Sequence, residues 1–174
     1  KEGAPLKETL SLFASGKEFH FSLTFVEGSR FEDWLKQLSS APYLERLTVE
    51  QSETELAQEL GIDNGKLEGW FLPETYAYTT HASDISILRR AYQDMKTFLQ
   101  ENWEKRQANL PYKTPYEALI MASIIEKETG QPDERAQIAS VFVNRLRLGM
   151  KLQTDPTVIY GVKDRYDGNI RRSD

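Results

Sequence analysis

The sequence lacks several residues on which whole classes of protein depend. It contains no cysteine, which excludes disulfide frameworks, thiolate metal sites and cysteine nucleophiles. Its two histidines, His20 and His81, are too few for a metal site built from several histidines. It also shows no phosphate-binding loop, no Ser-His-Asp order and no metal-ligand spacing. We therefore expect neither a metal nor a cofactor.

Long apolar runs and an excess of positive charge are missing as well. No run approaches the roughly 18–20 apolar residues that a membrane-spanning helix needs. Lys and Arg number 22 against 27 Asp and Glu, for a net charge of −5 at pH 7. Proteins that bind nucleic acid without sequence preference carry a basic patch, so we expect no nucleic-acid partner.

What is present is the composition of a globular chain with a core. The 174 residues are 39% hydrophobic and 28% charged, which fits one domain, or one domain with a fragment of another. Both ends lie within polar segments, and we expect the chain to be a piece of a longer protein. The best candidate for a subdomain boundary lies between residues 16 and 29.

The spacing of apolar residues predicts a mainly helical chain with little strand. Residues 18–26 alternate apolar and polar side chains, as a half-buried strand does, and Glu27-Gly28 would turn the chain. Residues 68–80 hold Pro73 among aromatic residues, which suggests an irregular or edge-strand segment. Caps, prolines and glycines predict helices at residues 5–15, ended by Gly16; 29–39, with Ser29 as N-cap; 53–60, ended by Gly61; from Ser83 or Asp84 to about 106; from Thr114-Pro115 onward; from Pro132 or Asp133 to Leu148; and 155–161, opened by Asp155-Pro156.

The helix that opens at Thr114-Pro115 runs from an apolar stretch directly into carboxylates. In ALIMASII, residues 118–125, apolar side chains occupy every direction around the helix, so we expect protein on all sides of it. Glu126 then follows on the stripe of Ala122 and Ser123, whereas Glu128 lies on another stripe, about 200° away. The two carboxylates therefore should not form one acid pair.

Glu126 has two interpretations. In the last turns of a helix the macrodipole disfavours negative charge, and partial burial acts in the same direction, so both would raise the pKa of Glu126. A raised pKa is what a general acid needs near neutral pH, and the small neighbouring side chains would leave room for a ligand. Alternatively, the residues Glu126 to Glu128 are a solvated last turn, paired with Arg135 or Arg145.

Two other segments are rich in groups that suit a ligand. KLQTDPTVIYG, residues 151–161, gathers hydrogen-bonding side chains: Gln153, Thr154, Asp155, Thr157 and Tyr160. A cap on the following helix explains Asp155, but it does not explain Gln153 or Tyr160. EGWFLPETY, residues 68–76, combines aromatic rings with carboxylates, which suits sugar rings, although such a cluster is more often part of a core.

Several of these segments resemble the endolytic murein transglycosylase family (MltG or YceG-like). The resemblance is carried by MASIIEKETG at residues 121–130 and by ASVFVNRLRLGMKLQTDPTVIYG at 139–161. EGWFLPETY at 68–76 and FVEGSRFEDWLKQL at 25–38 fit as well, in the same order. The resemblance thus covers nearly the whole chain, and ordered matches of this length are very specific.

The resemblance implies a lytic transglycosylase, a carbon–oxygen lyase that acts on a polysaccharide. Such an enzyme cleaves the β-1,4 bond between N-acetylmuramic acid and N-acetylglucosamine of nascent peptidoglycan and leaves 1,6-anhydro-muramic acid ends. The family's catalytic glutamate falls on Glu126. The residues expected to bind substrate are Gln153, Asp155, Thr157 and Tyr160, with Asn144, Glu74 and Tyr76 as weaker candidates.

One carboxyl group is enough for this reaction. Glu126 would protonate the leaving oxygen and would then accept the proton of the C6 hydroxyl of the same sugar, which attacks C1 from within. Retaining and inverting glycosidases need two carboxylates instead. The positive charge that develops on the sugar would be supported by Gln153, Asp155 or Tyr160.

The resemblance also predicts the setting of the chain. We expect an α+β fold in which residues 21–174 form the N-terminal and central part of a mainly helical catalytic domain with a small antiparallel sheet. Residues 1–20 would be the end of a LysM-like subdomain. In the full-length protein, a single-pass anchor in the cytoplasmic (inner) membrane would precede these residues, with the catalytic domain facing the periplasm or outer side, and the domain would continue past Asp174. The expected partners are peptidoglycan glycan strands and cell-wall synthases.

Two other functions stay open. The chain could belong to a non-catalytic glycan-binding scaffold of a cell-wall synthesis complex. It could also be a lyase with pyridoxal phosphate, because the family has carried an aminodeoxychorismate-lyase label. That chemistry needs a Schiff-base lysine in a phosphate-binding pocket, and Lys127 has no glycine-rich phosphate cradle nearby.

Overall fold

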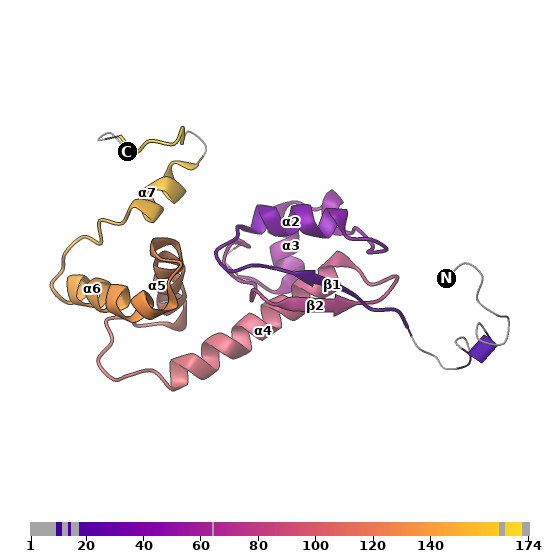
Figure 1. The fold of residues 1–174 in the computed structure, drawn as a ribbon, viewed down its shortest axis with the longest axis horizontal. Helices are drawn as coiled ribbons and strands as arrows, with labels where there is room; N and C mark the ends of the chain where they lie inside the picture. Colours follow the sequence, from indigo (N-terminus) through magenta and orange to yellow (C-terminus); the bar gives the residue numbers. More distant parts are fainter. Residues whose placement is uncertain (1–9, 12–13, 15–17, 64, 164–165, 172–174) are drawn as a thin grey trace.

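The protein has two lobes joined by one long helix (Figure 1), in a computed structural model that describes residues 10–11, 14, 18–63, 65–163 and 166–171. The first lobe holds β1 (Phe21–Thr24), α2 (Phe31–Ser40), η1 (Thr48–Glu50), α3 (Glu53–Leu60) and β2 (Thr75–Tyr78). α4 (Asp84–Glu104) leads to the second lobe, which holds α5 (Pro115–Glu128), η2 (Pro132–Glu134), α6 (Arg135–Arg147) and α7 (Asp155–Gly161). Most of the helix expected at residues 5–15, with Gly16, and most of the expected LysM-like segment fall outside the described residues; residues 10, 11 and 14 are helical.

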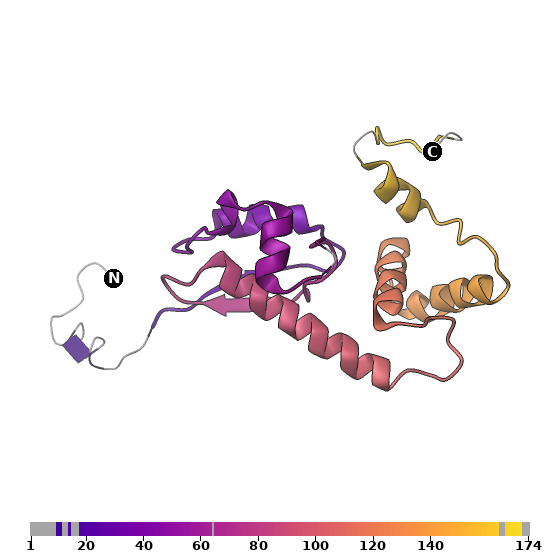
Figure 2. The same cartoon turned by 180° about the vertical axis from the view of Figure 1, so that it is seen from behind.

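The sheet of the first lobe consists of two antiparallel strands. β1 pairs with β2 from Phe21 opposite Tyr78 to Thr24 opposite Thr75. Figure 2 shows α3 and α4 on one face of this sheet, where Tyr76 and Tyr78 are buried. The strand predicted at 18–26 and the edge strand predicted within 68–80 are therefore confirmed, although β1 is shorter than expected. The mainly helical α+β class is confirmed as well.

Aromatic packing organises the core of the first lobe. Phe25, which follows β1, stacks on Trp34 of α2 with 3.8 Å between ring centroids and 3° between ring planes. Burying one such side chain contributes roughly 1.5–3 kcal/mol. Apolar residues from α2, α3, β2, the first half of α4 and the connecting segments are buried with them, among them Leu38, Leu56, Leu67, Phe71, Ile87 and Leu88.

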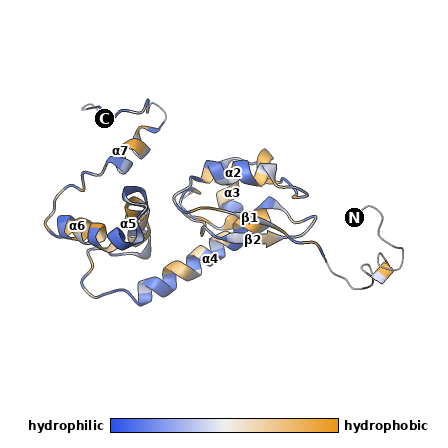
Figure 3. Ribbon diagram, viewed as in Figure 1, coloured by the Kyte–Doolittle hydropathy of each residue, from blue (hydrophilic) through white to orange (hydrophobic). Residues whose placement is uncertain are grey.

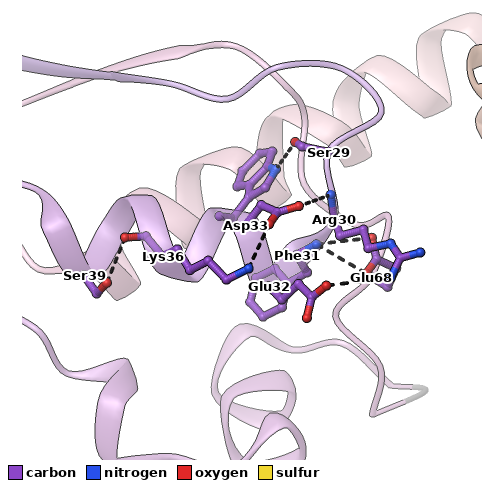
Figure 4. A network of polar contacts seen from close by, with 9 residues as sticks. Ser29, Arg30, Phe31, Glu32, Asp33, Lys36, Ser39 and Glu68 are labelled. Atoms are coloured by element: carbon purple, nitrogen blue, oxygen red, sulfur yellow. Dashed lines mark hydrogen bonds and ion pairs between the residues drawn. The ribbon is translucent and has the colours of Figure 1, made fainter. Parts of the chain in front are cut away.

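Most predicted helix boundaries agree with the structure because their signals are local. Gly61 ends α3 in the left-handed conformation, and Ser83 and Thr114 cap α4 and α5 by accepting hydrogen bonds from Ser86 N and Glu117 N. Ser29 was predicted wrongly as an N-cap, since α2 begins at Phe31 after Arg30. The Ser29 hydroxyl accepts from Trp34 Nε1 at 3.0 Å (Figure 4). It also donates to Val26 O at 2.6 Å, so it closes the preceding turn instead.

The long helix α4 is covered by the first lobe only along its first half. The apolar residues of its inner face are buried up to Met95, whereas Leu99 and Trp103 are half-buried and Phe98 is exposed. Among the described residues, no helix combines the length and the apolar composition that crossing a membrane requires.

The second lobe has a much smaller core, in which Met121 and Ile124 of α5 pack against Phe142 of α6. The expectation that protein surrounds α5 was wrong, because Tyr116 and Ile120 are 39% and 44% exposed. Figure 3 shows apolar residues on α5, and the described neighbours that pack on its buried residues come from α6 and from positions such as Tyr112 and Leu152. An apolar sequence alone could not reveal which face these neighbours cover.

Candidate active site

The last turn of α5 lies where the two lobes touch. A Cβ atom placed on Gly28, in the turn between β1 and α2, would lie 3.5 Å from Glu126 Cγ and 3.5 Å from Lys127 Nζ. Figure 1 shows that the connection from β1 to α2 is on the side of the first lobe that faces α5 and α7. Gly28 has a φ of +70°, which glycine adopts without steric cost. The predicted turn at Glu27-Gly28 therefore forms one wall beside Glu126.

Glu126 is partly buried and is held by one ion pair. Its side chain is 29% exposed, and its Oε2 lies 3.0 Å from Nη2 of Arg135, the first residue of α6. The pairing with Arg135 that the sequence suggested is confirmed, while Arg145 donates to Leu152 O instead. Among the described residues, no hydrogen bond or ion pair involves Glu126 Oε1.

The stripe of α5 that leads to Glu126 is open to solvent. Ala122 and Ser123, one turn before Glu126, are both exposed, and the Ser123 hydroxyl donates back to Ile120 O at 2.7 Å. Their small side chains cover little surface beside the carboxyl group. The space beside the carboxyl group is therefore not filled by side chains of α5, and its use by a ligand stays a prediction.

Glu128 points into different surroundings. Its carboxylate accepts a hydrogen bond from the hydroxyl of Thr154, which is 4% exposed. Together with Arg145 and Gln153 it lines a shallow pocket against α6. Gln153 has a φ of +52°, an uncommon conformation for a residue with a side chain. The structure thus places Gln153 beside Glu128, and the two glutamates have separate partners.

The start of α7 is built differently from the predicted cap. Thr154, and not Asp155, is the N-cap residue. Its hydroxyl donates to the Glu128 carboxylate and does not cap the helix. Asp155 is the first residue of α7 and is exposed. The Thr157 hydroxyl donates to Thr154 O at 2.8 Å, which closes the first turn. Asp155 is therefore left for another role than capping.

Tyr160 reaches the same turn as Glu126 from the other side. The guanidinium carbon of Arg30 lies 5.9 Å from the centroid of the Tyr160 ring. Burial raises the pKa of the Tyr160 hydroxyl, and the charge of Glu68 acts in the same direction. Because Arg30 is two residues after Gly28, Glu126 and Tyr160 border the two ends of one short turn.

The structure does not bring the remaining candidates to Glu126. Tyr76 is 2% exposed, its hydroxyl donates to Leu72 O at 2.8 Å, and burial raises its pKa to about 12. Tyr76 is therefore a core residue and does not line a surface next to Glu126. The Glu74 carboxylate accepts from Thr75 N within its own segment. Asn144 is exposed in the second half of α6.

The aromatic segment 68–76 contributes mainly to packing. Phe71 is buried against Phe31, and Trp70 stacks on Tyr116 of α5 with 5.0 Å between centroids and 6° between planes. The core interpretation of this segment is therefore the better one for Phe71 and Tyr76. Trp70 instead joins the two lobes.

Sequence reasoning missed Gly28 and Arg30 as neighbours of the candidate site. Gly28 carried a turn signal, but nothing local indicates that this turn touches a helix in the other lobe. In the part of the chain that the structure describes, no three His, Cys, Asp or Glu side chains gather as a metal ion would require.

Comparison with known proteins gives a consistent result. The whole chain, residues 1–174, matches the profile of the YceG-like family. An endolytic murein transglycosylase of Bacillus subtilis (strain 168) is 37% identical over 107 aligned positions, and the match covers 57% of this chain and 28% of that protein. A protein of the same name from Streptococcus pneumoniae (strain D39) is 31% identical over 97 residues, 55% of this chain and 17% of that protein. The matched segments thus span well under half of either relative.

A solved structure shows the same fold. The crystal structure of a yceG-like protein from Listeria monocytogenes matches 98% of this chain and 62% of its own chain, with a TM-score of 0.58. The two sequences are 22% identical, so this likeness bears on the fold alone.

Proposed function

The chain belongs to the YceG-like family, and from this premise we propose that it is the part of an endolytic murein transglycosylase that carries the catalytic glutamate. Its substrate is the glycan strand of nascent peptidoglycan, cleaved between N-acetylmuramic acid and N-acetylglucosamine. The observation that supports this most is the position of Glu126, partly buried at the end of α5, with one carboxyl oxygen held and an open stripe beside it.

Glu126 acts twice in the proposed reaction. Its neutral carboxyl group gives a proton to the O4 oxygen of the leaving N-acetylglucosamine as the bond from C1 to that oxygen breaks. The C6 hydroxyl of the muramic acid ring then attacks C1, and the Glu126 carboxylate accepts the hydroxyl proton. A 1,6-anhydro ring is formed, Glu126 is neutral again, and no water is consumed.

The neighbours of Glu126 fit these two steps. Arg135 holds Oε2 and so fixes the direction of the carboxyl group while Oε1 exchanges the proton. Gly28 leaves the space beside Glu126 without a side chain, so a sugar ring can come close to the carboxyl. The Tyr160 hydroxyl is protonated at neutral pH, as a tyrosine ordinarily is, and can donate a hydrogen bond to a sugar oxygen.

The setting of the enzyme is part of the same proposal. A cell-wall substrate places the catalytic domain on the outer side of the cytoplasmic membrane, with a single-pass anchor elsewhere in the full-length protein and cell-wall synthases as partners. These points rest on the family resemblance of the sequence. Fractionation of cells that produce the tagged full-length protein tests them, since recovery in the soluble cytosol would contradict the location.

Product analysis tests the reaction itself. The full-length protein is incubated with uncrosslinked glycan strands, and the products are identified by mass spectrometry. We expect internal cuts that leave 1,6-anhydro-muramic acid ends. Strands that are bound but never cut would favour the scaffold, and reducing ends would show hydrolysis by water instead of ring closure.

A further inference from the structure

A second cavity, of about 240 Å³, lies beside the candidate active site and has no part in the proposed reaction. It is formed mainly by the first lobe, around the start of α2, and Lys163 reaches it from the segment after α7. Its apolar surface comes from Leu35, Leu56 and Leu67. The cavity shares Arg30 with the active-site turn, because Arg30 lines it and also lies over the Tyr160 ring.

Hydrogen-bond acceptors in the cavity have capacity left for a ligand. Gln51 Nε2 donates to Glu59 Oε2 at 2.8 Å, which fixes the amide, and its buried Oε1 has no hydrogen-bond partner among the described residues. A buried acceptor without a donor is costly, so a ligand N–H group would be favourable here. From the described residues, the Glu68 carboxylate accepts one shared hydrogen bond, from Phe31 N to both of its oxygens at 3.3 Å each (Figure 4).

Two cations, Arg30 and Lys163, line the cavity together with the carboxylates of Glu32, Glu53 and Glu68. Arg30 forms a long ion pair with Glu32 at 3.7 Å, and the charge of Lys163 acts on Glu68 and Tyr160. Both cations belong to segments next to Tyr160, so they lie on the side of the cavity nearest the candidate active site. A carboxylate entering from that side would meet two cations, and the N–H groups behind it would meet Gln51 and Glu68.

We propose that this cavity binds the peptide carried by the muramic acid ring that reacts at Glu126, an inference that rests on the proposed function. A short acidic peptide offers the matching groups: backbone N–H for Gln51 and Glu68, a carboxylate for Arg30 and Lys163, and small aliphatic side chains for the leucine surface. The ring that closes on itself is also the ring that bears the peptide. Binding the peptide therefore selects which glycosidic bond reaches Glu126.

Kinetics on two substrates test the proposal. The full-length enzyme is assayed on peptide-bearing glycan strands and on the same strands after an amidase has removed the peptides. We expect kcat/KM to be higher on the peptide-bearing strands by about tenfold, the worth of roughly one charge-assisted hydrogen bond. In Lys163→Gln and Glu68→Gln this ratio falls toward one. In Lys36→Gln, which removes a cation that pairs with Asp33 on the outside of α2, the ratio stays at the wild-type value.

Equal rates on both substrates in the wild type, or a ratio that Lys163→Gln leaves unchanged, would overturn the inference. If neither substrate is cut, the proposed function fails, and direct binding decides the role of the cavity. The tripeptide released from the strands is then titrated against wild type and Lys163→Gln by NMR. Saturable binding that the variant weakens supports the site, and no binding, or equal binding, contradicts it.

Discussion

Glu126 and Glu128 are separated by a single residue, yet the structure gives them different surroundings. Glu126 contacts a guanidinium on one oxygen and lies beside a glycine turn, whereas Glu128 accepts a hydrogen bond from a buried threonine. Their helical phase accounts for the difference, because two residues turn the side chain by about 200°. The chemical role of a carboxylate is thus set by its direction from the helix axis.

Substitution of Arg135 tests whether the orientation of the Glu126 carboxyl group matters for catalysis. The ion pair is partly exposed, so Arg135→Gln should change the free energy of unfolding by at most about 1 kcal/mol. Because Glu126 loses the group that holds Oε2, we expect kcat to fall about tenfold, with KM little changed. Arg135→Lys should restore part of the rate. A kcat that stays at the wild-type value in Arg135→Gln would show that the ion pair has no part in catalysis.

The partly buried Glu68 carboxyl group should make the free energy of unfolding depend on pH. Burial raises the pKa of Glu68 above its ordinary value of 4.5, so the folded protein keeps this proton to higher pH than the unfolded chain does. The stabilisation linked to this proton is complete below the ordinary pKa and is lost as the pH rises through the raised pKa. Glu68→Gln should therefore flatten the decline in unfolding free energy above pH 4.5. Urea unfolding at several pH values measures this pH dependence, and Glu74→Gln, at an exposed glutamate, is the control. If the unfolding free energy declines with pH equally steeply in both variants, Glu68 is not the cause.

At the scale of elements, the turn between β1 and α2 contributes most to the candidate active site. It is short, it positions Gly28 against the end of α5, and two residues later it presents Arg30 to Tyr160. The turn itself was predictable from Glu27-Gly28, as were the boundaries of α3 and α5, because caps, prolines and left-handed glycines act within a few residues. The start of α2 was predicted wrongly at Ser29, because the indole of Trp34, five positions along, donates a hydrogen bond to the Ser29 hydroxyl.

Gly28→Ala and Gly61→Ala form a matched pair of variants. Both glycines have a φ near +70°, at +70° and +74°, so each substitution should cost about 1 kcal/mol in unfolding free energy. At Gly61 nothing lies within 4 Å of an added Cβ, whereas at Gly28 the methyl group meets Glu126 and Lys127. We therefore expect both variants to lose similar stability, while only Gly28→Ala slows glycan cleavage, about tenfold. Equal activity of the two variants would contradict a role for the turn in the site.

At the scale of the whole molecule, the candidate site depends on how two lobes are held together. Contacts between them include Gly28 with Glu126, Arg30 with Tyr160 and Trp70 with Tyr116. Glu126 could be singled out from the sequence because helical phase and family resemblance agree on it. Apart from Arg135, its surroundings could not, since Gly28 and Arg30 lie in a turn of the other lobe that is far from α5 in the sequence. The open face of α5 likewise depends on which elements cover it.

The stack of Trp70 on Tyr116 should restrict the motion of one lobe against the other. Loss of such an aromatic pair costs about 0.5–1.5 kcal/mol, so Tyr116→Ala should widen the distribution of distances between the lobes. Because the chain has no cysteine, Ser39→Cys on α2 and Ser140→Cys on α6 provide unique sites for spin labels. Tyr43→Ala, which removes a ring contact within the first lobe, is the control. An unchanged distribution in Tyr116→Ala would show that the other contacts hold the lobes without it.

The most direct measurement compares Glu126→Gln with Glu128→Gln in the full-length protein on uncrosslinked glycan strands. Anhydro-muropeptides are quantified by mass spectrometry, and strand binding is measured in parallel. We expect Glu126→Gln to abolish the anhydro product while strand binding is retained, and Glu128→Gln to yield the product still, with a loss of about tenfold at most. Anhydro product from Glu126→Gln at the wild-type level would contradict the account.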